Sequence, residues 1–139
     1  MRHTPSQSWV MAAILLGSGY ALVGILFAVP ATHVQAWRLA AWVVSATGYA
    51  AHIGYERFAL RNPPRNSALH VALAVALGAF GLAVGANIHS QYILSTTQHR
   101  ALLLLSLGVW PIITALPAFV VALSINAVLA RWFCGAQAK

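Results

Sequence analysis

"SALHVALAVALGAFGLAVGANIH", residues 67–89, is a long apolar stretch that contains no Asp, Glu, Lys or Arg. A helix needs about 20 predominantly apolar residues to cross the hydrocarbon core of a bilayer. This stretch meets that requirement, so the sequence predicts a membrane-spanning helix over 67–89. Asn66 or Ser67 is expected to cap its N-terminus, because both residue types accept hydrogen bonds from the first helical turn.

Three other stretches are long and predominantly apolar, namely residues 9–29, 36–56, which includes Arg38 and Glu56, and 101–130. Pro111 and Pro117 lie inside the last of them and are expected to kink it. The joining loops are short, which leaves no room for an extramembrane domain. We therefore predict an all-α, integral membrane four-helix transmembrane bundle in which residues 1–139 form a single domain.

The composition supports a protein whose main solvent is lipid. The chain is 60% hydrophobic and 6% charged, whereas soluble domains carry about 25% charged residues. Its net charge of +7 comes from basic residues scattered between apolar runs. Because nucleic-acid binding requires a dense basic face, that class of partner is not expected. A single cysteine, Cys134, excludes an internal disulfide framework.

The basic residues predict the orientation of the bundle. With four spans, one side carries six of them and the other side only Arg38 and Arg100. Cytoplasmic loops are rich in Lys and Arg, so the bundle is expected in the inner (plasma) membrane with both termini cytoplasmic. Arg57, Arg61 and Arg65 would be the main topology anchor. The six residues of the basic side are Arg2, Arg57, Arg61, Arg65, Arg131 and Lys139.

An alternative interpretation of the first span is a cleaved signal peptide. Arg2, the apolar run and "AVPATHVQA" resemble such a segment, with cleavage after Ala36. The apolar run is, however, about twice the usual length of the apolar region of a signal peptide, which favours a retained span.

Small residues recur every three or four positions in three of the predicted spans. Such spacing places them on one helix face, where they allow two helix backbones to approach closely. The first and third sets keep a constant offset, so an internal duplication of a two-helix hairpin is an alternative origin. With the polar residues on the same faces included, the sets are Ala13, Gly17, Ala21, Gly24 and Ala28 in the first span, Arg38, Ala41, Ser45, Gly48 and His52 in the second, and His70, Ala74, Gly78, Gly81 and Gly85 in the third.

The hairpin between the second and third spans holds the only acidic residue, Glu56. His52 precedes it by four residues, so both side chains share a helix face. His70 begins the next span at a similar depth, and the antiparallel hairpin should bring all three to one level. Two histidines and a carboxylate could ligate a divalent metal, and two histidines alone could ligate a haem.

We expect a structural role for these three residues, with no cofactor. In that interpretation Glu56 pairs with Arg57, Arg61 or Arg65 at the membrane surface. His52 then bonds Glu56, and His70 caps the next helix. On the opposite rim His33, His89 and His99 offer a further, weaker metal alternative.

Several activities have no residues to support them. The chain has no aspartate, no pair of carboxylates for acid–base catalysis and no glycine-rich phosphate loop. We therefore predict a non-enzymatic accessory or scaffold subunit that acts through helix packing, with other membrane subunits or as a homo-oligomer. The alternatives are a small oligomeric transporter or channel-forming subunit, and a haem- or metal-binding membrane anchor of a redox complex.

Overall fold

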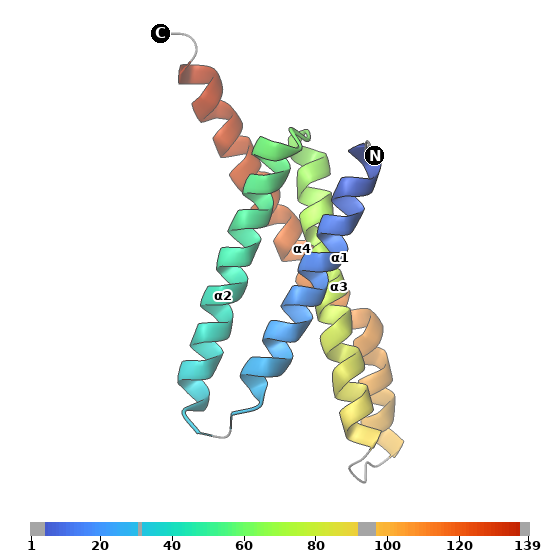
Figure 1. Cartoon of the computed structure of the whole chain (residues 1–139). Helices are drawn as coiled ribbons and strands as arrows, with labels where there is room; N and C mark the ends of the chain where they lie inside the picture. The colour runs from blue at the N-terminus through green and yellow to red at the C-terminus, as the bar shows by residue number, and fades with distance from the viewer. Residues whose placement is uncertain (1–4, 31, 92–96, 137–139) are drawn as a thin grey trace.

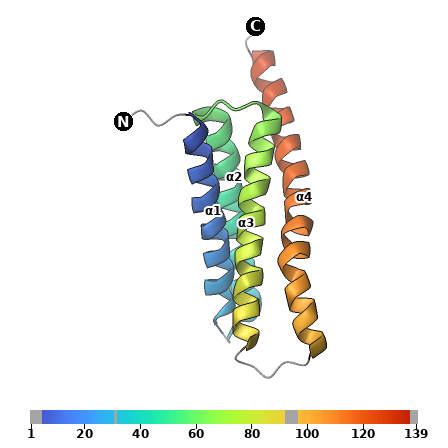
Figure 2. The same cartoon turned by 90° about the vertical axis from the view of Figure 1, so that its right-hand side faces the viewer.

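The computed structural model describes residues 5–30, 32–91 and 97–136, and this part of the chain is helical without strands. The helices are α1 (Pro5–Ala28), α2 (Val34–Gly54), α3 (Pro64–Gln91) and α4 (Thr97–Ala136). A π-helical turn, η1 (Tyr55–Ala59), continues α2. The predicted all-helical class is confirmed. Consecutive helices run in opposite directions, so α1 begins and α4 ends at the same end of the molecule (Figures 1 and 2).

Three of the four helices are long and apolar enough to cross a membrane. Their spans are Trp9–Ala28 in α1, Pro64–His89 in α3 and Arg100–Trp132 in α4. α2 is long enough but more polar, because Gln35, Arg38 and His52 fall within it. The fold is therefore compatible with a membrane protein, and a crossing by α2 stays a prediction.

α3 occupies the centre of the bundle and packs against both α1 and α4. Small side chains make these close contacts possible, and Ala68, Val71 and Ala74 of α3 are fully buried with Ala122 of α4. α2 lies at the edge, contacts mainly α1, and diverges from α4 (Figure 1). Pro111 and Pro117 lie inside α4, which continues through both.

α3 begins earlier than the sequence predicts. Pro64 is its first residue, and the backbone N–H of Ser67 donates to the Pro63 carbonyl at 3.0 Å. The predicted cap at Asn66 or Ser67 is wrong, because proline suits the first helical position, where its fixed φ is favourable and no N–H is needed. Ser67 is instead buried in the bundle.

Two asparagines join α3 to α4 near opposite ends of their interface. The Asn126 side-chain N–H donates to the Ser67 hydroxyl at 3.2 Å, and that of Asn87 donates to the Leu103 carbonyl at 2.8 Å. In hydrocarbon such side chains bond across helices. They fix the register of α3 against α4.

Candidate functional site

The hairpin between α2 and α3 is shaped by the π-helical turn. The turn is defined by a hydrogen bond between residues five apart, in which the N–H of Leu60 donates to the Tyr55 carbonyl at 3.1 Å. π-turns are rare and often mark functional positions in helices. Arg61 then adopts a left-handed conformation, with φ 52°, and reverses the chain. The turn carries Glu56 into the protein, where it has no exposed surface.

Four side chains, Glu56, His52, His70 and Asn62, form the Glu56 cluster. Glu56 Oε2 accepts a hydrogen bond from Asn62 Nδ2 at 2.6 Å and lies 3.0 Å from His70 Nδ1. Glu56 Oε1 lies 3.8 Å from His52 Nε2. The backbone N–H of Asn62 also donates to the Glu56 carbonyl, at 3.1 Å. The carboxyl group therefore ties the end of α2 to the start of α3.

Part of the cluster has no protein partner. Both ring nitrogens of His52 and Glu56 Oε1 are buried without a hydrogen bond within the described structure. The 3.8 Å between His52 Nε2 and Glu56 Oε1 is too long for a direct hydrogen bond. A bridging water would suit this separation, because water commonly satisfies pairs of buried polar groups.

His70 is held on a second side by an aromatic contact. Its ring stacks on the indole of Trp9 in α1, with ring centroids 4.2 Å apart and planes inclined by 5°. The expected capping role of His70 is wrong, because the side chain points to Glu56 and Trp9. This contact also links the start of α1 to the cluster.

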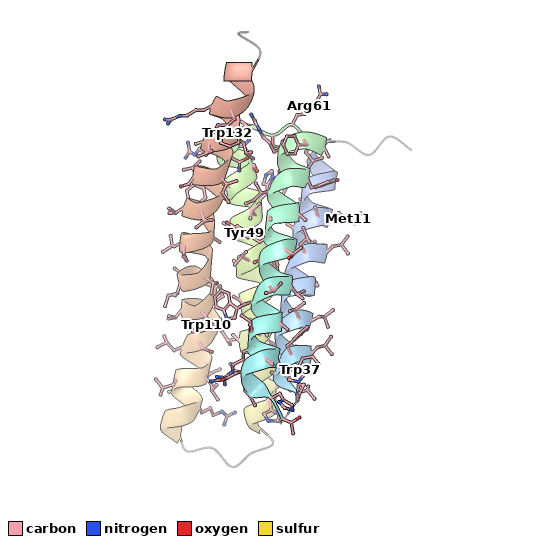
Figure 3. All side chains as sticks on the ribbon, turned by 90° about the vertical axis from the view of Figure 1, so that its left-hand side faces the viewer. Met11, Trp37, Tyr49, Arg61, Trp110 and Trp132 are labelled. Atoms are coloured by element: carbon pink, nitrogen blue, oxygen red, sulfur yellow. The ribbon has the colours of Figure 1, made fainter. Side chains whose placement is uncertain are left out.

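The structure brings His52, Glu56 and His70 to one level, as the hairpin geometry predicts. It differs in the partners of Glu56: the ion pairs of this carboxylate within the described residues are with the two histidines. Arg57 is half-buried, whereas Arg61 and Arg65 are exposed. Arg61 lies at the same end as Trp132, and Trp37 lies toward the other end (Figure 3). The three arginines are therefore placed at one end of the bundle, as a topology anchor requires.

A metal ion at this site would need at least three protein ligands close together. The described residues hold no group of three or more His, Cys, Asp or Glu that could bind a metal ion. The Glu56 carboxylate lies 3.8 Å from His52 Nε2 through Oε1 and 3.0 Å from His70 Nδ1 through Oε2. On the opposite rim His33 and His89 are exposed, and the side chain of His99 is outside the described part of the chain.

The small-residue stripes of α1 and α3 face each other inside the chain. A Cβ added at Gly17 would lie 2.9 Å from the Ala74 carbonyl oxygen, and one at Gly78 would lie 3.1 Å from that of Gly17. Only glycine allows backbones this close. The remaining members follow the same interface: Gly81 faces Ala21, Gly24 faces Leu82, Gly85 faces Ile25, and Ala13 and Ala74 are buried.

The stripe of α2 has a different neighbour. A Cβ at Gly48 would contact the Tyr20 ring of α1 at 3.6 Å, and Ser45 lines a cavity between the helices. α2 therefore packs against an aromatic side chain beside the α1 stripe. α1 and α3 run parallel, as a tandem duplication requires, but α2 and α4 pack differently on them.

Comparison of the chain with family models, with curated proteins and with solved structures finds no match. The role of the chain is therefore inferred from its own residues and their geometry. Sequence reasoning missed Asn62 and Trp9 as members of this site. Asn62 stands before two prolines, where a turn residue is ordinary, and Trp9 is typical of an interfacial aromatic, so neither position carried a distinguishing signal.

Proposed function

We propose that this chain is a multipass protein of the inner membrane and serves as a non-enzymatic accessory subunit that associates through helix packing. α2 provides the observation that supports this role. Unlike α1, α3 and α4, it contains no stretch apolar enough to count as a membrane span, it lies at the edge of the bundle, and its buried residues are confined to His52 and Ile53 at its end. A helix of this kind is stabilised in a bilayer when other helices cover it.

The stripes of α1 and α3 cannot provide that association surface, because they pack on each other. The outer face of α2 carries exposed apolar side chains together with Thr47, whose hydroxyl donates to the Val43 carbonyl at 2.8 Å. Helices in membranes associate through such apolar and hydroxyl-bearing faces. A second copy of the chain or another membrane subunit would be the partner.

In-membrane photocrosslinking tests this proposal. A benzophenone side chain at Thr47 should give a protein adduct of defined mass, twice that of the chain for a homo-oligomer. The control is the same group at Leu105, an exposed residue of α4, which should label lipid only. If both positions label only lipid, the subunit role is wrong.

The two alternatives receive less support. A transporter needs a polar path, but the side chains that line the cavity among the four helices are mainly apolar or aromatic. A haem or metal anchor needs histidine nitrogens that face one space; His70 Nδ1 lies 3.0 Å from Glu56 Oε2, whereas both ring nitrogens of His52 are without a hydrogen bond within the described structure. A visible spectrum of the purified protein tests the haem alternative directly.

A further inference from the structure

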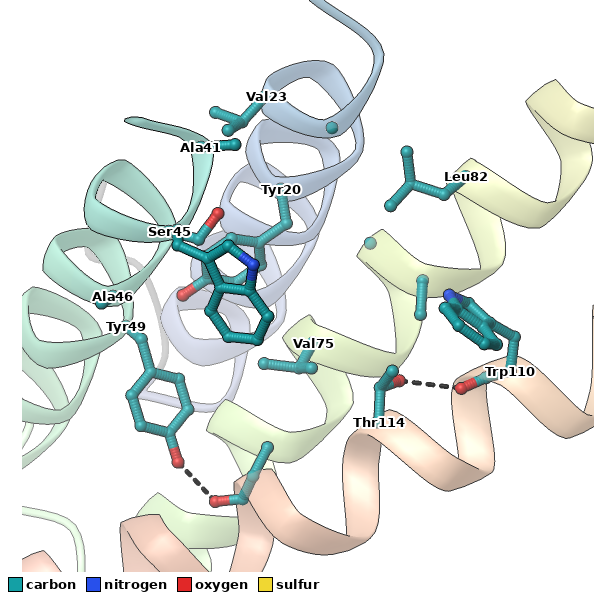
Figure 4. Close-up of a pocket in the computed structure, with 15 residues that line it drawn as sticks. Tyr20, Val23, Ala41, Ser45, Ala46, Tyr49, Val75, Leu82, Trp110 and Thr114 are labelled. Carbon is teal, nitrogen blue, oxygen red and sulfur yellow. Dashed lines mark hydrogen bonds between the residues drawn. The ribbon is translucent and has the colours of Figure 1, made fainter. Parts of the chain in front are cut away.

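A cavity of about 490 Å³ lies where α2 diverges from α4. This volume falls within the range of about 300–1,000 Å³ that small-molecule sites occupy. All four helices contribute to its wall, and its side chains are mainly small or aromatic (Figure 4). The polar and aromatic members are Tyr20, Trp42, Ser45, Tyr49, Trp110 and Thr114.

The cavity lies near the middle of the spans. Tyr20 is eleven residues from Trp9 and eight from Ala28, the ends of the α1 span. At 1.5 Å per residue these separations are about 16 Å and about 12 Å. The hydrocarbon core is about 30 Å thick, so Tyr20 lies close to its centre, far from the ester groups of phospholipids.

Tyr20 presents a hydrogen-bond donor without an acceptor. Its hydroxyl oxygen is buried and has no partner within the described structure. Two other hydroxyls of the lining are bonded: Tyr49 donates to the Ala118 carbonyl, and Thr114 donates to the Trp110 carbonyl at 2.9 Å. Hydrocarbon offers no acceptor, so an unpaired hydroxyl there is unfavourable unless a ligand supplies one.

The position of Tyr20 is fixed by its neighbours. Its ring lies against Gly48 of α2, and its Cβ lies where a side chain at Gly78 of α3 would be. The side chain is therefore held among α1, α2 and α3, and its hydroxyl oxygen is covered by protein, so a ligand in the cavity reaches it only after a small displacement of the ring. Fixed polar groups in a mainly apolar pocket are what orients a bound small molecule.

We propose that this cavity binds one lipophilic quinone, which enters from the bilayer between α2 and α4 and accepts a hydrogen bond from Tyr20. Trp42 and Trp110 line the cavity and are 76% and 50% exposed, so their indole rings are free to stack on a flat conjugated ring. An acyl chain would leave the Tyr20 hydroxyl unpaired. A helix of a partner protein is too large for the cavity. A helix with its side chains is about 10 Å wide, so little more than one turn of it would fill the cavity volume.

The test measures quenching of tryptophan fluorescence by decyl-benzoquinone in nanodiscs that contain the purified full chain. Quenching should contain a saturable component in addition to the quenching that partitioning into lipid produces, since Trp42 and Trp110 line the site. Decylbenzene, which has the same alkyl chain and no carbonyl, should compete at least fivefold more weakly. Equal competition by decylbenzene would overturn the hydrogen bond to Tyr20.

Three variants complete the test. Ala46→Phe fills the cavity from an exposed position in α2 and should remove the saturable component. Val44→Phe adds the same ring outside the cavity lining and should keep it. Tyr20→Phe keeps the packing and should weaken binding about fivefold, the usual worth of one neutral hydrogen bond. The absence of saturable quenching in the unmutated protein, or its persistence in Ala46→Phe, would show that the cavity is not a quinone site.

Discussion

Glu56 illustrates how far one buried carboxyl group can connect separate elements. Its Oε2 accepts a hydrogen bond from the side-chain N–H of Asn62 at 2.6 Å and lies 3.0 Å from His70 Nδ1. Removing the carboxyl group would leave these partners unsatisfied in the interior. The cost of such a change is set by the desolvated partners and exceeds that of losing a surface ion pair.

Glu56→Ala is therefore predicted to lower the free energy of unfolding by about 1–3 kcal/mol. The matched control, Arg57→Ala, removes the neighbouring charge from a partly exposed position and should change it by less than about 0.5 kcal/mol. Titration of the purified protein with SDS in mixed micelles measures both. Equal losses in the two variants would mean that the Glu56 cluster contributes no more than the surface does.

Helical spacing was enough to predict that His52, Glu56 and His70 meet, because residues four apart share a face and a hairpin aligns its two ends. The partners of Glu56 could not be predicted in the same way. The π-helical turn moves the carboxyl group away from Arg57, Arg61 and Arg65, and a backbone turn of this kind has no side-chain signature. Asn62 enters the cluster through that turn.

At the scale of elements, the α1–α3 interface requires glycine at some positions of α1, whereas another glycine of the same helix has open space around it. A Cβ at Gly17 would lie 2.8 Å from the Leu77 Cβ, whereas one at Gly19 would have no neighbour within 4 Å. The two residues are two positions apart in α1. Substitution by alanine therefore tests contact with α3 at Gly17 and helix propensity alone at Gly19.

Gly17→Ala should destabilise the bundle by about 1–3 kcal/mol, because the added methyl group forces the helices apart. Gly19→Ala should stabilise it by about 0.5–1 kcal/mol, because alanine favours the helix without a clash. The same SDS titration compares them. Stabilisation in both variants would show that α1 and α3 are not in close contact at Gly17.

The existence and approximate extent of the four helices could be predicted from apolar length, whereas their ends and their partners required the structure. α3 begins at Pro64 because proline suits the first position of a helix. The sequence offered this start and also the two possible caps at Asn66 and Ser67, and it did not decide between them. The small stripes indicated close packing but could not indicate whether it occurs within one chain or between chains. Gly17 and Gly78 show that it occurs within the chain.

At the scale of the whole molecule, α2 determines the number of crossings. The basic residues are divided between the two sides as the positive-inside rule requires only if α2 spans the membrane together with α1, α3 and α4. Its own residues give a weaker drive into the bilayer than those of the other helices. Burial of His52 and of the hydrogen-bonded Glu56 within the protein reduces the cost of placing this polar end at the membrane boundary.

Reporter fusions at His33, Arg61 and Lys139 should therefore place His33 on the outer side of the membrane and the other two positions in the cytoplasm. With four crossings, the α1–α2 connection and the α2–α3 hairpin lie on opposite sides. Without a crossing by α2, three crossings remain. His33, Arg61 and Lys139 would then all report the same side of the membrane, opposite to the N-terminus. The pair His33 and Arg61 decides the matter, because their relative location changes only with the crossing of α2, whatever the orientation of the rest of the bundle.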